Sequence, residues 1–162
     1  VMGTRSGDLD PAVLIYLSRR ARLSTDDLDV LLNKQSGLLG LAGASDMRDI
    51  EQRRDAGDEA AALAFDVYIH RLRAYIGAYI AQLGGVDVIS FTAGVGENSD
   101  TVRAAAMATL GFAGVEIDEA RNTERSRDAR VISTDESRVT VLVVPTNEEL
   151  EIARQALAVA AE

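Results

Sequence analysis

Apolar residues recur at helical spacing through most of the chain. A first helix is predicted to start at Asp10-Pro11, because Asp is a favourable N-cap and Pro suits the first helical position. Ser24 is predicted to cap a second helix, and Ser45 a third, more polar one. The longest helical pattern covers 58–83 and stops at Gly84-Gly85, a common signal for a helix C-terminus.

Two runs of apolar and β-branched residues, 86–91 and 139–144, predict strands, the first of them buried. A short edge strand at 115–117 is one of two interpretations of a mixed region, the other being irregular chain. The glycine-punctuated segment 36–43 predicts a turn that carries buried leucines.

Strands that alternate with helices and are nearly all apolar predict an α/β fold with a mostly parallel sheet. Thr146 and Glu149 are predicted to form a capping box for a last helix. Two strands are too few for a sheet that about six helices would cover, so we expect part of a domain to be absent. The start at Val1, directly before a Gly/Thr/Arg turn and without an initiator Met, leads to the same expectation.

Composition narrows the class of protein. Apolar residues make up 47% of the chain and charged residues 27%, which is typical of a soluble globular domain. The net charge of −9, with Lys and Arg scattered, disfavours binding to nucleic acid or an anionic membrane. There is no cysteine for a disulfide or a thiolate metal site, and no apolar run of the roughly 18 residues that a membrane span needs. With no signal-peptide pattern, we expect a cytoplasmic protein.

The segment 92–99, between a predicted strand and a predicted helix, is the strongest candidate site. Its glycines allow a ligand to approach the backbone, and the following helix N-terminus suits a phosphate or a ribose. The spacing is neither a Rossmann fingerprint nor a Walker loop. A tight β-to-α turn capped by Ser99 therefore explains the pattern equally well.

Four other side chains have a functional and a structural interpretation. Arg5 could present its guanidinium to a phosphoryl group, or could pair on the surface with a nearby Asp, which chemistry alone favours. Asp46 and Arg48 sit at a predicted helix start, where both could be ordinary surface residues. Glu148 follows a predicted core strand, where a carboxylate could organise Mg²⁺, but acids are common in a first helical turn. His70, the one histidine, is given no role.

Five segments, taken in order, resemble acetate kinases. They are 2–11 (MGTRSGDLDP), 32–40 (LNKQSGLLG), 45–49 (SDMRD), 91–99 (FTAGVGENS) and 145–150 (PTNEEL). The resemblance covers essentially the whole chain and matches the C-terminal portion of the family. It implies an α/β chain from the C-terminal part of the duplicated sugar kinase, Hsp70 and actin-like (ribonuclease H-like) fold, with the N-terminal domain absent.

The resemblance also implies the chemistry. Acetate kinases transfer the γ-phosphoryl group of ATP reversibly to acetate, giving acetyl phosphate and ADP, with Mg²⁺. Arg5 would stabilise the phosphoryl group in flight, and Glu148 would be tied to Mg²⁺. The residues that match nucleotide-holding segments are Asp46, Met47, Arg48, Gly94, Val95, Gly96, Glu97 and Asn98.

By the same resemblance, 1–148 would be an incomplete nucleotide-binding domain, and 149–162 a helix that packs on the missing N-terminal domain. Several family residues that bind substrate or metal lie upstream of Val1 in the family pattern, so this chain alone is expected to be inactive. A homodimer through this C-terminal domain is expected, with the helix at 58–83 as a contributor.

Two other enzyme activities and one non-enzymatic role stay open. Propionate or butyrate kinase activity is compatible with the same motifs. A non-catalytic, actin-like nucleotide-binding module is the second alternative, although it would not need the Arg5 segment. A NAD-dependent enzyme fits worst, because the third glycine of the fingerprint is missing.

Overall fold

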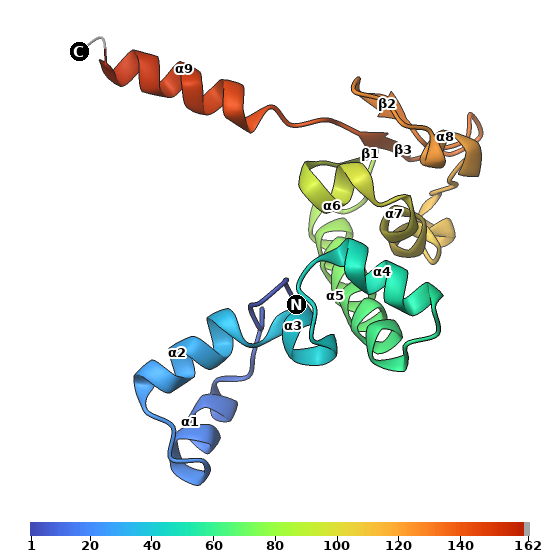
Figure 1. Cartoon of the computed structure of the whole chain (residues 1–162). Helices are drawn as coiled ribbons and strands as arrows, with labels where there is room; N and C mark the ends of the chain where they lie inside the picture. The colour runs from blue at the N-terminus through green and yellow to red at the C-terminus, as the bar shows by residue number, and fades with distance from the viewer. Residues whose placement is uncertain (161–162) are drawn as a thin grey trace. The chain divides into compact units, whose positions relative to one another are not determined.

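The computed structural model describes residues 1–160 and divides into two compact units (Figure 1). The first unit is Val1–Tyr79 and the second begins at Ile80. The 25-residue helix α5, Glu59–Leu83, crosses this boundary. None of the helices in the described part of the chain has the length and apolar character needed to cross a membrane.

The first unit is all helical. Its elements are α1 (Pro11–Arg20), α2 (Thr25–Lys34), α3 (Gly37–Ala42), α4 (Met47–Asp55) and most of α5. The predicted caps of the first two helices are confirmed: the Asp10 side chain accepts the Ala12 N–H, and Ser24 forms a capping box with Asp27. The predicted end of α5 is also confirmed, because Gly84 follows its last residue with φ 73°.

Two sequence predictions in this unit are wrong. The segment 36–43 is not a turn, because Gly37–Ala42 form helix α3, which ends in Gly43 as a left-handed C-cap. The N-cap of α4 is Asp46 and not Ser45, since the Asp46 carboxylate accepts the N–H of Arg48. In both places the glycine or serine residues led to a wrong prediction of where a helix begins.

The core of the first unit lies between the N-terminal loop, α3, α4 and the first half of α5. Its members share an exposed fraction of 6% or less: Leu38, Ala42, Met47, Ile50, Ala61, Ala64, Phe65 and Ile69. Arg54 extends this packing, with its guanidinium carbon 4.3 Å from the centre of the Phe65 ring. By contrast, none of the residues of α1 is buried.

The second unit combines a small sheet with short helices. Its elements after α5 are β1 (Val88–Phe91), α6 (Ala93–Asn98), α7 (Asp100–Met107), a 3-10 turn η1 (Gly111–Ala113), α8 (Glu119–Thr123), β2 (Arg130–Val131), β3 (Thr140–Val143) and α9 (Glu148–Ala160). The strand order is β1-β3-β2. β1 pairs parallel to β3, with Phe91 opposite Val143, and β2 pairs antiparallel to β3.

The structure confirms the two predicted strands, but the burial of the first differs from the prediction. Val141 and Val143 of the central strand β3 are fully buried, whereas Val88 of β1 is 52% exposed, so the prediction of a buried first strand is wrong. β1 is an edge strand, with β3 on one side only. The region at 115–117 contributes a single isolated bridge, Ile117 to Ser133, instead of a strand.

Candidate functional site

The loop that carries Arg5 is fastened to the start of α3 by backbone hydrogen bonds. The N–H groups of Ser36, Leu38 and Leu39 donate to the carbonyl oxygens of Thr4, Met2 and Gly3, at 2.9–3.0 Å. This packing requires glycine at 37, where φ is 65° and an added Cβ would lie 2.1 Å from the Met2 carbonyl oxygen. Segments 2–11 and 32–40 are therefore parts of one hydrogen-bonded substructure.

Arg5 has a neutral partner. Its Nε donates to the side-chain oxygen of Asn33 at 3.2 Å, and the amide nitrogen of Asn33 donates to Asp29 at 2.8 Å. The predicted surface pairing with a nearby Asp is wrong, because Asp10 caps α1 and Asp8 accepts from Arg71 and Tyr75. Arg5 thus lines a cavity of about 420 Å³ with its positive charge unneutralised by a carboxylate.

In residues 46–48 the side chains of Asp46 and Arg48 bond to each other, whereas the Met47 side chain is buried. Asp46 accepts from the backbone N–H and the Nε of Arg48 at 2.9 and 3.0 Å, and these bonds from Arg48 lower the pKa of the carboxyl to about 2. The Arg48 side chain is 85% exposed. Met47 is only 5% exposed, so its side chain belongs to the core and only its backbone can reach a ligand.

The segment 92–99 in the second unit folds into the short helix α6 instead of an open glycine loop, so the prediction of a turn there is wrong. Ala93 begins this helix with φ 58°, a left-handed conformation that is uncommon outside glycine. Asn98 ends it and donates to the Gly94 carbonyl at 2.8 Å. The predicted cap is confirmed, since the Ser99 hydroxyl accepts the N–H of Val102 at the start of α7.

Glu97 connects α6 to the segment after β3. Its carboxylate accepts from both the N–H and the hydroxyl of Thr146, each at 2.8 Å. The hydrogen bond from the Thr146 N–H holds the pKa of Glu97 below its usual value. The predicted capping box is therefore wrong: Thr146 is engaged by Glu97, and Asn147 accepts the N–H of Leu150 in its place.

A cavity of about 340 Å³ brings two predicted functional groups together. It is lined by Ala93 and Gly94 from the start of α6 and by 146–149. Gly94, predicted to hold a nucleotide, and Glu148, predicted to be tied to Mg²⁺, thus share one space. No group of three or more metal-binding side chains occurs within 1–160. One carboxylate still fits Mg²⁺, which usually keeps waters and takes further oxygens from substrate phosphates.

Sequence reasoning missed Arg103, which holds α6 in place by hydrogen bonds to backbone carbonyl groups of that helix. Its side chain is 2% exposed and donates to the carbonyl oxygens of Gly96 and Glu97 at 2.9 and 3.0 Å, and to Asn122 at 2.6 and 2.8 Å. Burial, with a smaller effect of the positive charge on Arg130, lowers its pKa to about 10. The available signal was an arginine beside Val102 within the apolar face of a predicted helix.

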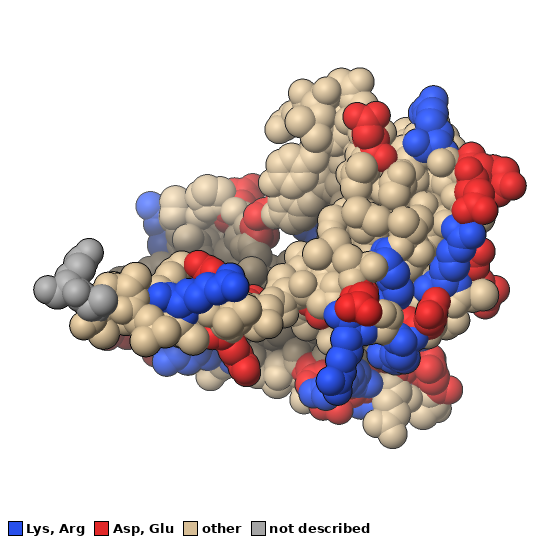
Figure 2. Space-filling model, turned by 90° about the horizontal axis from the view of Figure 1, so that it is seen from above, with Lys and Arg blue, Asp and Glu red and all other residues tan. Residues whose placement is uncertain are grey.

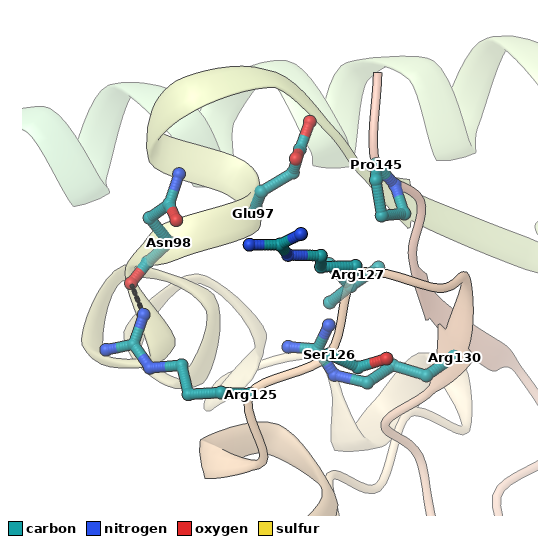
Figure 3. A pocket seen from close by; sticks show the side chains of 8 residues that line it. Glu97, Asn98, Arg125, Ser126, Arg127, Arg130 and Pro145 are labelled. Atoms are coloured by element: carbon teal, nitrogen blue, oxygen red, sulfur yellow. Dashed lines mark hydrogen bonds between the residues drawn. The ribbon is translucent and has the colours of Figure 1, made fainter. Parts of the chain in front are cut away.

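A second missed feature is a pocket of about 290 Å³ beside Glu97 and Asn98. Figure 3 shows the side chains of Arg125, Arg127 and Arg130 extending into it, with the Glu97 carboxylate turned away from them. Arg125 donates to the Asn98 carbonyl at 3.1 Å. Arg125 and Arg127 lie between α8 and β2, and Arg130 is the first residue of β2; the sequence showed no known motif in this stretch.

Comparison with known proteins agrees with this arrangement. A model of the acetokinase family matches residues 1–154. An acetate kinase of Leifsonia xyli subsp. xyli is 64% identical over 97% of this chain and 40% of its own length. The crystal structure of Porphyromonas gingivalis acetate kinase superposes with a TM-score of 0.89 at 45% identity, over 98% of this chain and 40% of that one. A propionate kinase from Francisella tularensis gives 0.85 at 38% identity, over 94% and 39%. The chain thus spans about 40% of the length of these relatives.

Proposed function

We propose that this chain, which belongs to the acetokinase family, is the nucleotide-holding part of an enzyme that transfers the γ-phosphoryl group of ATP reversibly to acetate, giving acetyl phosphate and ADP. The fold is a mixed α/β part of the sugar kinase, Hsp70 and actin-like architecture. The observation that carries the proposal is Arg5, a cation held on a fastened loop with only a neutral partner.

Arg5 stabilises the phosphoryl group during its transfer. In phosphoryl transfer negative charge spreads over the equatorial oxygens, and a guanidinium that is already oriented stabilises it without reorganisation. The hydrogen bond from Arg5 to Asn33 leaves the two terminal nitrogens of the guanidinium for those oxygens. Transfer in line between the acetate oxygen and the γ-phosphorus then depends on positioning and charge neutralisation.

Residues 46–48 and 94–98 are proposed to bind the nucleotide. Arg48 contributes an exposed guanidinium, Asp46 keeps it oriented, and Met47 contributes backbone only. Gly94 to Asn98 contribute the accessible surface of α6, whose position Glu97 fixes through Thr146. Glu148 would hold Mg²⁺ together with phosphate oxygens of ATP, and that ion would neutralise charge on the phosphates when bound.

Residues 1–148 are proposed to belong to the C-terminal nucleotide-binding domain of the whole enzyme, incomplete at its N-terminal side. Of the last segment, 149–162, the structure describes residues up to 160, as helix α9. Four of its apolar residues are exposed by 44–73%: Leu150, Ile152, Leu157 and Val159. Leu150 and Leu157 lie on one side of α9, and Ile152 and Val159 lie on the opposite side. Exposed apolar side chains favour burial, and we expect α9 to pack on the part of the enzyme that lies outside this chain.

The whole enzyme is proposed to be a cytoplasmic homodimer. Helix α5 leaves Leu63, Tyr75, Tyr79 and Leu83 exposed by 42–76%, an apolar surface suited to a second copy. Nucleic acid is not an expected partner, since acidic and basic side chains lie interspersed over the face drawn in Figure 2 and the net charge is −9.

The test is formation of acetyl hydroxamate from ATP and acetate by the full gene product, compared with propionate and butyrate at equal concentration. The highest kcat/KM with acetate supports the proposal. A preference for propionate supports the second candidate, which the 38% identity to a propionate kinase favours. No product with any short carboxylate would instead indicate a non-catalytic nucleotide-binding module. The 162-residue chain alone is expected to give no turnover.

A further inference from the structure

We propose that the pocket lined by Arg125, Arg127 and Arg130, here named the arginine pocket, binds a phosphoryl group beside the end of the nucleotide segment 94–98, whose Glu97 and Asn98 also line the pocket. The arginine pocket has a volume of about 290 Å³ and apolar walls from Val143 and Pro145. The proposal does not depend on kinase activity, because it rests on three arginines to which the proposed reaction gives no role.

The charges in the arginine pocket are unbalanced. No salt bridge to Arg125, Arg127 or Arg130 is found in the described part of the chain, whereas other arginines of the same unit, such as Arg121, pair with acids. The one carboxylate that borders the pocket, Glu97, is occupied by the two donors of Thr146. Three cations and one carboxylate therefore line one space, which leaves the arginine pocket with a net positive charge.

A buried donor without a partner points to the same missing anion. The Nε atom of Arg130 is buried and has no hydrogen-bond partner among residues 1–160. Leaving a buried, charged donor unsatisfied is costly, so such a group usually signals an unseen acceptor. Arg103, fully buried behind α6, experiences the positive charges of Arg130 and Arg125, which an anion in the pocket would offset.

A phosphoryl group fits this pocket better than a carboxylate. It has a charge of about −1.5 to −2 at neutral pH and three strong acceptor oxygens, against one charge and two oxygens for a carboxylate. Planar guanidinium groups match phosphate oxygens in pairs. With Arg125 already bound to the Asn98 carbonyl, the other two cations, Arg127 and Arg130, would make the main contacts.

The source of the phosphoryl group is either free inorganic phosphate or a phosphate monoester. Calorimetric titration of the full gene product with inorganic phosphate and with ethyl phosphate separates them, because only a site open to an ester accepts both. We expect saturable binding that weakens as the salt concentration rises from about 50 to 300 mM, since exposed charges are screened within about 8–10 Å at physiological salt.

Variants identify the site. Arg127→Gln removes an exposed charge and is expected to weaken phosphate binding about tenfold, the effect of losing one charged hydrogen bond. The double variant Arg127→Gln/Arg130→Gln is expected to remove detectable binding. Arg154→Gln, an exposed arginine of α9 in the same unit, is the matched control and should change the Kd less than twofold. Thermal melts show whether each variant is folded.

Three outcomes would overturn the proposal. The first is no binding of either probe at millimolar concentration by folded wild-type protein. The second is an unchanged Kd for folded Arg127→Gln. The third is displacement of phosphate by ADP together with a tenfold rise in the KM for ATP in Arg127→Gln, which would assign these arginines to the nucleotide site. A wild-type protein that binds phosphate but lacks kinase activity would contradict only the proposed function.

Discussion

The Glu97 carboxylate accepts two hydrogen bonds from Thr146, one from the N–H and one from the hydroxyl, each 2.8 Å long. Through this pair, the segment that follows β1 is tied to the segment that follows β3. The two strands are parallel neighbours, so both segments leave the same end of the sheet. The hydrogen bonds thereby fix the two walls of the cavity, the start of α6 and residues 146–149, relative to each other.

Glu97→Gln tests this connection through pH. Because the pKa of Glu97 is lower in the folded protein than its ordinary value of 4.5, its ionised form stabilises the fold above that value. This stabilisation is lost as the pH falls below about 4.5 and through the lowered folded pKa. We expect the Tm of the wild type to fall more steeply between pH 5 and pH 3 than that of Glu97→Gln. Glu149→Gln, which removes a nearby exposed acid, is the control and should keep the wild-type slope.

Gly37→Ala is expected to disrupt the Arg5 loop. The new Cβ would meet the Met2 carbonyl at 2.1 Å and would also be forced into a left-handed conformation. Strain and overpacking together should lower the free energy of unfolding by about 2–6 kcal/mol. Gly43→Ala has a similar φ of 72° but open space around the Cβ, so it should cost only about 1–2 kcal/mol. Urea unfolding measures both, and equal losses would show that the clash relaxes.

Arg5→Lys and Arg5→Ala test the catalytic assignment. If Arg5 stabilises the transferring phosphoryl group, kcat of the full gene product should fall by about 10³-fold or more in either variant, as for other arginines in phosphoryl transfer. The lysine variant keeps the charge but not the fork that donates to two oxygens. Arg20→Gln, an exposed arginine at the end of α1, should leave kcat unchanged. A fall of less than tenfold in folded Arg5→Ala would remove Arg5 from the mechanism.

Arg103→Met is expected to destabilise the second unit. The substitution leaves the carbonyl oxygens of Gly96 and Glu97 and the side chain of Asn122 without their donor in a buried place. Each lost partner costs about 1–3 kcal/mol, so a total of about 3–5 kcal/mol is expected. Arg154→Met, on the exposed helix α9, should change the free energy of unfolding by less than about 0.5 kcal/mol. Equal unfolding curves for the two variants would contradict the support that Arg103 gives to α6.

Ala93→Gly tests the strained start of α6. Ala93 has φ 58°, where an L side chain costs about 1–2 kcal/mol and glycine costs nothing. The gain is partly offset by the freer unfolded chain, so we expect a net stabilisation of about 0.5 kcal/mol. Ala104→Gly, at an exposed position inside α7, should instead lose about 0.5–1 kcal/mol. A loss of the same size in Ala93→Gly would show that the left-handed conformation is not maintained in solution.

Features with a local cause could be predicted from the sequence. Asp10, Ser24 and Ser99 cap helices because their side chains reach N–H groups two or three residues ahead. The central strand β3 was recognisable because Val141, Leu142 and Val143 are apolar and follow the β-branched Thr140. The segments that resemble acetate kinases were found for a different reason, because their order along the chain is distinctive.

Features decided by distant contacts could not be predicted. Thr146 is a suitable cap by sequence, but Glu97, 49 residues earlier, takes both of its donors, and Asn147 becomes the cap. The strand β2 has only two residues and exists through its pairing with β3. The arginine pocket combines a loop, a strand and the end of α6, none of which is unusual alone.

The order of the strands determines when the second unit can fold during synthesis. β1 has one neighbour, β3, and about fifty residues separate them along the chain. At the usual rate of about 5–20 residues per second, β1 waits roughly 3–10 s for its partner to be translated. Helices α6 and α7 need only local contacts and can form meanwhile, whereas the parallel pairing requires a long loop to close. Production of β3 on the ribosome therefore sets the earliest moment at which the cavity beside Gly94 exists.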